Sequence, residues 1–211
     1  MLWIARPGGL TQEEMENNAD IVINTYRSMG FDDNTIAGIL GNMQNESSVN
    51  PQREEEGGGG GYGLVQWTPK SVLINHCNTL GLSPYDDGDI QLQVIPREIR
   101  NESGVAEWYT TEAFITPYYV SGATPDMIGI TGEQFLSNEM NWTADKLAIM
   151  FMVGYERPSY DPETNHAEKR KQDALTWLEY MGGVVPPTPT PSGSGKGLIN
   201  LWLCKALTGG L

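Results

Sequence analysis

Cysteine, histidine and basic residues are scarce in this sequence of 211 residues. The two cysteines, Cys77 and Cys204, lie in segments of very different character, so two free thiols are expected rather than a disulfide. The two histidines, His76 and His166, show no metal-ligand spacing with each other or with the cysteines. Neither a metal site nor a cofactor is therefore expected.

Positive charge and long apolar runs are also lacking. The 27 acidic residues outnumber the 13 basic ones and give a formal net charge of -14. Such a field repels nucleic acid and anionic membrane surfaces. The first residues lack the apolar run of a secretion signal, and no segment is long enough to cross a bilayer. We therefore expect no nucleic-acid partner, no membrane insertion and no secretion signal.

One amphipathic segment carries a carboxylate in an unusual place. The apolar residues that recur there at helical spacing are Ile36, Ile39, Leu40 and Met43. Glu46 continues the same face, and Asn-Pro at 50–51 predicts the end of the helix. Apolar neighbours and the negative end of the helix dipole would both disfavour a charged Glu46. A glutamic acid in such a place can serve as a proton donor in a cleft.

The remaining pattern predicts a mainly α fold (α+β) with one small β element. Thr11 and Glu14 form a capping box that opens a first helix. Further helices are predicted after Thr68-Pro69, over 89–101 with a bend at Pro96, from Thr143 to about residue 156, and over 167–181. The aromatic and branched residues of 62–68 predict a short strand, after a mobile glycine-rich loop or hairpin tip.

Composition divides the chain into three parts. Residues 1–183 form the predicted domain, and 184–196 are a linker rich in Pro, Thr, Gly and Ser. Residues 197–211 form an apolar C-terminal tail of marginal helical length. This tail either folds back on the domain or docks on another protein, and the sequence leaves both readings open.

Three separated motifs occur in a fixed order. They are Leu-Gly-Asn-Met-Gln-Asn-Glu-Ser at 40–47 with Asn-Pro at 50–51, Gly-Leu-Val-Gln-Trp-Thr-Pro at 63–69, and Tyr-Glu-Arg-Pro at 155–158. This order resembles the lysozyme superfamily, in which a helix supplies the acid and the following hairpin forms one wall of a sugar-binding cleft. More closely, the motifs resemble the phage-tail lysozyme family. Its members sit at the tail tip of small podophages and open the cell wall during infection.

The resemblance implies a lysozyme-like domain with one small β-hairpin beside the catalytic cleft. Glu46 matches the catalytic acid of the family. Gln66 and Tyr155 match positions that line the cleft near the scissile bond in related lysozymes and transglycosylases. Some members carry a zinc endopeptidase domain after the lysozyme domain. Here the linker leads to a short tail, so no peptide-cleaving activity is expected. Residues 116–132 look like additional sequence whose role the resemblance does not explain.

Other candidate site residues rest on the sequence pattern. Glu54, Glu55 and Glu56 precede five consecutive glycines; such runs are most often solvated charge, but one carboxylate here can act on the nucleophilic water. Tyr62 and Trp67 can pack in the hairpin or stack on a sugar ring, and the pattern does not decide between these roles.

Three further side chains are expected to have no role in catalysis. Glu156 and Arg157 are interpreted as a structural pair at a helix end. His76 is interpreted as exposed.

The resulting hypothesis is a glycoside hydrolase of the lysozyme type. We predict a muramidase that cleaves the β-1,4 bond between N-acetylmuramic acid and N-acetylglucosamine in peptidoglycan, with inversion. It would be made in the host cytoplasm, act from the virion tail tip on the host cell wall, and contact tail-tip proteins through 197–211. Two alternatives stay open: a lytic transglycosylase that yields anhydro-muropeptides, and a non-enzymatic tail structural or wall-binding module.

Overall fold

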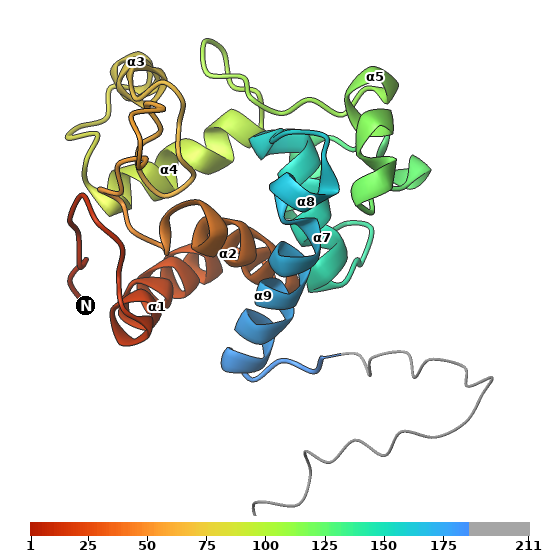
Figure 1. The fold of residues 1–211 in the computed structure, drawn as a ribbon, viewed down its shortest axis with the longest axis horizontal. Coiled ribbons are helices and arrows are strands. Elements are labelled where there is room, and N and C mark those ends of the chain that lie inside the picture. Colours follow the sequence, from red (N-terminus) through yellow and green to blue (C-terminus); the bar gives the residue numbers. More distant parts are fainter. Residues whose placement is uncertain (186–211) are drawn as a thin grey trace, which may run out of the picture.

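The computed structural model of the protein describes residues 1–185, which form a mainly helical domain (Figure 1). The predicted tail at 197–211 and residues 186–196 of the predicted linker lie outside the described residues, so both stay predictions. Within 1–185, no helix has the length and apolar character needed to span a bilayer. The same residues contain no group of three His, Cys, Asp or Glu side chains placed to hold a metal ion.

Long helices build the domain, and two short 3-10 helices lie within 116–132, the segment that looked like additional sequence. In chain order they are α1 (Gln12–Ser28), α2 (Asp33–Ser47), α3 (Ser71–Leu80), α4 (Gly88–Ile99), α5 (Glu112–Ile115), the 3-10 helices η1 (Thr116–Ser121) and η2 (Pro125–Met127), α6 (Gly132–Leu136), α7 (Ala144–Phe151), the π-helical turn η3 (Met152–Glu156), α8 (Pro162–Asn165) and α9 (Ala167–Tyr180).

The helix ends follow the local chemistry of the sequence. The capping box predicted at the start of α1 is confirmed, with the Thr11 hydroxyl accepting from Glu14 N–H and the Glu14 carboxylate accepting from Thr11 N–H. Asp32 caps α2 by accepting from Thr35 N–H at 2.7 Å. At the other end, Ser48 takes the left-handed conformation (φ 58°), so α2 ends just before the predicted stop.

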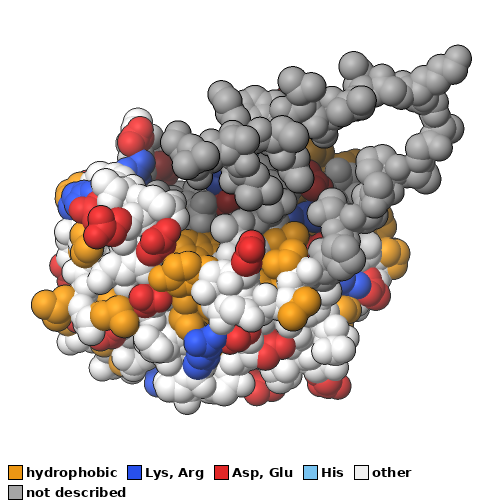
Figure 2. Space-filling view, turned by 90° about the horizontal axis from the view of Figure 1, so that it is seen from below, with side chains coloured by type: hydrophobic (Ala, Val, Ile, Leu, Met, Phe, Trp, Pro, Cys, Tyr) orange, Lys and Arg blue, Asp and Glu red, His pale blue; other side chains and the backbone are white. Residues whose placement is uncertain are grey.

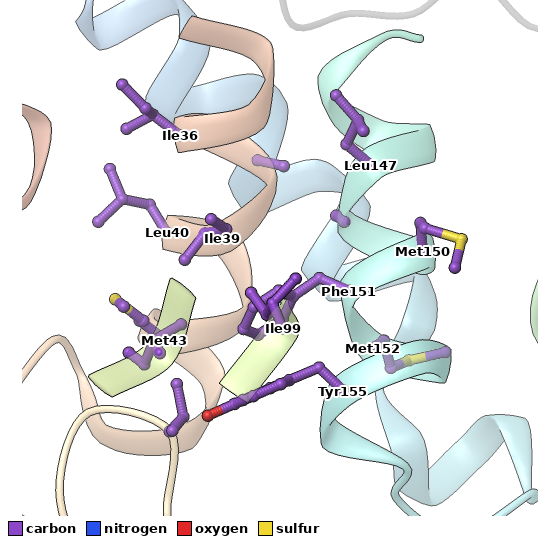
Figure 3. Close-up of a cluster of buried hydrophobic side chains, with 14 of the residues drawn as sticks. Ile36, Ile39, Leu40, Met43, Ile99, Leu147, Met150, Phe151, Met152 and Tyr155 are labelled. Atoms are coloured by element: carbon purple, nitrogen blue, oxygen red, sulfur yellow. The ribbon is translucent and has the colours of Figure 1, made fainter. Parts of the chain in front are cut away.

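The apolar stripe of α2 lies in the centre of the core. Its residues Ile36, Ile39, Leu40 and Met43 are all fully buried. Figure 3 shows this stripe facing the elements that carry Phe151 and Tyr155. Full burial of four large side chains fixes the rotation of α2 about its axis. It thereby fixes the direction in which the last turn of the helix points.

Two glycines allow α2 to approach its neighbours α7 and α9 at backbone distance. A Cβ added at Gly38 would lie 3.0 Å from the backbone nitrogen of Ala148 on α7. A Cβ added at Gly41 would lie 2.6 Å from the Arg170 carbonyl oxygen and 2.8 Å from Ala174 N on α9. Figure 1 shows α9 crossing beside α2. The glycines of α2 therefore set how closely the first turns of α9 approach it.

The β-hairpin predicted beside the cleft is not confirmed. Among the described residues this segment shows only isolated bridges, of Tyr62 with Trp67 and with Glu54. Gly63 (φ 81°) and Gln66 (φ 51°) reverse the chain inside the motif. Tyr62 and Trp67 consequently exchange backbone hydrogen bonds of 3.2 and 3.0 Å across a tight turn. Such a turn leaves no run of extended residues that could form a strand.

The predicted helix start at Thr68-Pro69 is also wrong, because α3 begins at Ser71. The Thr68 hydroxyl, which would have capped the helix, donates to the Gln66 carbonyl at 2.8 Å. It thereby stabilises the tight turn instead. Pro96, where a bend was predicted, lies within α4.

Substitution of Gly41 by alanine tests the close packing of α2 on α9. We expect Gly41→Ala to lower the free energy of unfolding by about 1–3 kcal/mol, since a Cβ there meets backbone atoms that cannot rotate away. This loss must outweigh the roughly 1 kcal/mol that alanine gains over glycine in a helix. Urea unfolding measures it. Gly8→Ala, where an added Cβ meets nothing within 4 Å, is the matched control. A Gly41→Ala variant as stable as the wild type would contradict the packing argument.

Candidate active site

A cleft of about 380 Å³ opens beside the C-terminal end of α2, and it brings the three sequence motifs together. The first motif contributes Glu46, the second Gln66 and Trp67, and the third Tyr155. Of the acidic run, Glu55 lines the cleft. Five predicted site residues from four separate places in the sequence therefore share one surface.

Glu46 faces a charged partner that the sequence did not predict. Its Oε1 accepts a hydrogen bond of 2.5 Å from the guanidinium of Arg170 on α9, 124 residues away. The Glu46 side chain is 19% exposed and that of Arg170 only 5%. The expectation of apolar surroundings is therefore wrong on this side, because α9 brings a nearly buried cation against the carboxylate.

Arg170 is fixed by contacts on three sides. Its Nε donates to the Asn165 carbonyl at 2.9 Å, and a terminal nitrogen donates to Asn42 Oδ1 at 2.8 Å. Asn42 is fully buried on α2 and donates in turn to the Ala148 carbonyl of α7 at 3.0 Å. The guanidinium cannot turn away from Glu46 without leaving buried polar groups unpaired, which is costly.

Glu55 is held by the glycines that follow it. Gly61 N–H donates to Glu55 Oε2 at 2.9 Å, and Glu55 N–H donates to the Gly61 carbonyl at 3.0 Å. A Cβ added at Gly59 would lie 2.2 Å from Glu55 Oε1, so a side chain there has no room unless Glu55 moves. The loop thus ties the Glu55 carboxylate back to Gly61 at the cleft, and its predicted mobility stays a prediction.

Glu54, Glu56 and Tyr62 are placed outside the cleft lining. Glu56 pairs with Arg53 at 2.7 Å on the surface, and Glu54 lies 3.8 Å from Lys70. Tyr62 is 5% exposed, and the Lys70 ammonium lies 3.8 Å from the centroid of its ring. The structure thus separates the members of the acidic run, which the sequence alone could not rank.

Gln66 is fixed within the tight turn at the cleft wall. Its Nε2 donates to the carbonyls of Arg53 and Gly63 at 3.1 and 3.0 Å. The turn is attached to α2 through Ser47, whose hydroxyl donates to the Leu64 carbonyl at 2.9 Å. The position of Gln66 relative to the end of α2 therefore depends on both motifs at once.

Trp67 and Tyr155 form the floor of the cleft and share one buried acceptor, Glu98 of α4. The Trp67 indole donates to Glu98 Oε1 at 2.9 Å, and the Tyr155 hydroxyl donates to Oε2. Burial and the Glu98 charge raise the pKa of Tyr155 well above its usual range, so the hydroxyl keeps its proton. Both rings are about 6% exposed. They are core residues that also reach the cleft, and Figure 3 shows Tyr155 extending toward the end of α2.

His76 belongs to the same cluster, so the expectation that it is exposed is wrong. Its Nδ1 lies 2.5 Å from Glu98 Oε1, and its side chain is 12% exposed. The hydrogen bond to Glu98 raises the pKa of His76, against the opposing effect of burial. The contact therefore favours the protonated, positively charged form of His76 beside a carboxylate that is fully buried.

The predicted pair of Glu156 with Arg157 is wrong. Arg157 takes the left-handed conformation (φ 51°) and donates at 2.6 Å to both the backbone carbonyl and the carboxylate of Glu107. Its guanidinium also stacks over the Tyr109 ring, 4.7 Å from the centroid. Arg157 thus fastens the third motif to the segment before α5, and Glu156 is left free to face the cleft.

Glu156 is the most perturbed carboxyl of the cleft. Its residue is partly exposed, but its Oε1 is sealed from solvent and has no hydrogen-bond partner among residues 1–185. Burial, reinforced by the negative charge of Glu46, raises the pKa of Glu156 well above its usual range, while Arg170 and Arg157 oppose this. Burial at this place therefore favours the neutral form of the Glu156 carboxyl.

The sequence does contain a signal for Arg170. Arg170 lies three residues after Ala167 and four before Ala174, both buried residues of the inward face of α9. An arginine on the inward face of a helix needs an anionic or polar partner.

On the face shown in Figure 2, acidic side chains are spread widely among neutral residues, in keeping with the net charge.

The His76–Glu98 contact predicts a pH-dependent stability. Because the folded-state pKa of His76 lies above its unfolded value of about 6.5, the contact stabilises fully below that pH and is lost as pH rises through the folded-state pKa. The difference in Tm between the wild type and His76→Asn should therefore be largest at low pH and shrink on the alkaline side. His166→Asn, at an exposed position, is the matched control. A difference that stays constant with pH would contradict a charged His76.

Comparison with known proteins gives a match to a region that contains the same three motifs. A family model described as phage tail lysozyme matches residues 17–181. Morphogenesis protein 1 of Bacillus phage B103 is 32% identical over 178 residues, which cover 82% of this chain. The chain spans 42% of the length of that relative. The match includes the end of α2, the tight turn and the Tyr-Glu-Arg-Pro motif, and so the chain belongs to the phage tail lysozyme family.

Proposed function

We propose that this domain is a muramidase that hydrolyses the β-1,4 bond between N-acetylmuramic acid and N-acetylglucosamine in peptidoglycan. The observation that carries the proposal is the placement of two carboxylates, Glu46 and Glu55, on the lining of one open cleft. Glycoside hydrolysis uses such a pair, one group as acid and the other to act on water or on the sugar. Membership of the phage tail lysozyme family supports the substrate class.

Glu46 is the proposed general acid. It stands at the end of a helix whose rotation the core fixes, and Arg170 holds its carboxyl in one position. Protonation of the leaving glycosidic oxygen by Glu46 leaves a carboxylate that the guanidinium stabilises. Arg170 therefore serves the proposed reaction by accommodating the charge that develops on the acid.

Glu55 is the proposed second carboxylate. Its two backbone hydrogen bonds with Gly61 hold it at the cleft, where it can accept a proton from the attacking water. We propose a single displacement with inversion at the anomeric carbon. Tyr155 and Trp67 supply apolar ring surface to the cleft, and Gln66 supplies an amide oxygen that can accept a hydrogen bond from a sugar hydroxyl.

The proposed setting is the virion, with the domain acting on the host cell wall from the tail tip. Family membership and the phage relative support a place in the phage particle. Residues 197–211 are proposed to contact other tail-tip proteins, on the strength of their apolar sequence alone.

Glutamine substitutions of single carboxylates test the proposal. Glu46→Gln should lower the rate of peptidoglycan lysis by about 10²- to 10⁴-fold, the usual effect of losing a general acid. Glu55→Gln should lower it by about 10²-fold. Lysis is measured as release of dye from labelled peptidoglycan, after circular dichroism has shown that each variant is folded.

The acidic run provides its own matched controls. Glu54→Gln and Glu56→Gln remove the same charge from the same segment, but neither residue lines the cleft, so lysis should stay near the wild-type rate. Equal losses in all three variants would indicate an effect of net charge on binding to the wall. A folded Glu46→Gln variant with wild-type lysis would rule out its proposed role, and no lysis by the wild type would favour a non-enzymatic module.

A further inference from the structure

The cleft contains a third carboxyl that the proposed reaction does not use. Glu156 occupies the last residue of η3 and lines the cleft with Glu46. Its Oε1 is sealed from solvent and, within the described part of the chain, has no hydrogen-bond partner. A buried and unpaired carboxyl oxygen is costly, so a native protein that retains one at a cleft calls for an explanation.

The charges around Glu156 come from four elements. Glu46 on α2 and Glu98 on α4 act to keep it neutral, and Arg170 on α9 and Arg157 after η3 act in the opposite direction. Burial outweighs the two cations. Glu46 lines the same cleft as Glu156 and is itself paired with the Arg170 guanidinium. The two carboxyls therefore interact and cannot titrate independently.

We infer that Glu46 and Glu156 hold one proton between them, and that Glu156 is a positioning residue that keeps this proton available to Glu46 at neutral pH. The inference rests on the proposed function. Its structural basis is the sealed and unpaired Oε1 of Glu156, in the cleft that Glu46 also lines. Glu46 and Glu156 then act together as the general acid of the site, and Glu46 is the one that reaches the substrate.

The proton balance of one turnover is as follows. Glu46 gives its proton to the leaving oxygen as the glycosidic C–O bond breaks, and water bonds to the anomeric carbon while giving a proton to Glu55. Glu46 regains a proton from Glu156. Glu156 is reprotonated from solvent and Glu55 returns its proton to solvent, so one water is consumed per bond cleaved.

The pH profile of lysis by Glu156→Gln tests the inference, since glutamine keeps the shape of the neutral acid but carries no transferable proton. A coupled pair holds a single proton between its two apparent pKa values, and in that range the fraction of protonated Glu46 hardly changes with pH. For a single carboxyl above its pKa, the protonated fraction falls about tenfold per pH unit. The alkaline limb of kcat/KM should therefore move down by about one pH unit or more. Near pH 5 the variant should lyse at nearly the wild-type rate.

Two controls separate the outcomes. Glu54→Gln removes a carboxylate that lies outside the cleft lining and should leave the alkaline limb in place. Carbon-13 NMR of the wild type labelled at glutamate carboxyls reports the titration without need of activity. The Glu156 signal is assigned by its absence from the spectrum of the folded Glu156→Gln variant. The inference is overturned if the Glu156 signal titrates below about pH 5, or if the variant has the wild-type pH profile. Loss of lysis by the wild type itself would instead overturn the proposed function.

Discussion

Arg170 makes the contact on which the rest of the site depends. Its guanidinium is almost buried, and it joins the end of α2 to α9 by donating to Glu46, to Asn42 and to the Asn165 carbonyl. A buried cation is tolerated only when its donors are paired, so these acceptors and the helices that carry them are fixed together. Gly41 allows the contact, because any side chain there would push α9 away.

A second constraint comes from the buried carboxylate of Glu98, which binds Trp67, Tyr155 and His76 at once. These three residues come from the tight turn, from η3 and from α3. The cleft walls are therefore tied to a common point beneath its floor. Polar networks of this kind restrict a fold to one arrangement when every member is paired. Two buried charged groups therefore hold the shape of the cleft: Arg170 beside Glu46, and Glu98 below the floor.

Local sequence patterns predicted the features that depend on residues close together in the chain. The capping box of α1, the apolar stripe of α2 and the place of Glu46 all follow from residues close together in the chain. The partner of Glu46 could not be found this way, since it lies 124 residues away on another helix. The hairpin was predicted from β-propensity in 62–68, but Gly63 and Gln66 at positive φ decide the turn.

The central claim is that this cleft hydrolyses a glycosidic bond with water, aided by Glu55. Digestion of purified peptidoglycan in water enriched in ¹⁸O, followed by mass spectrometry of the released muropeptides, tests it most directly. Hydrolysis places one ¹⁸O atom on the reducing end of each new N-acetylmuramic acid, and the account predicts this product. Anhydro ends without ¹⁸O would show that a hydroxyl of the substrate displaces the leaving group, and would contradict the account.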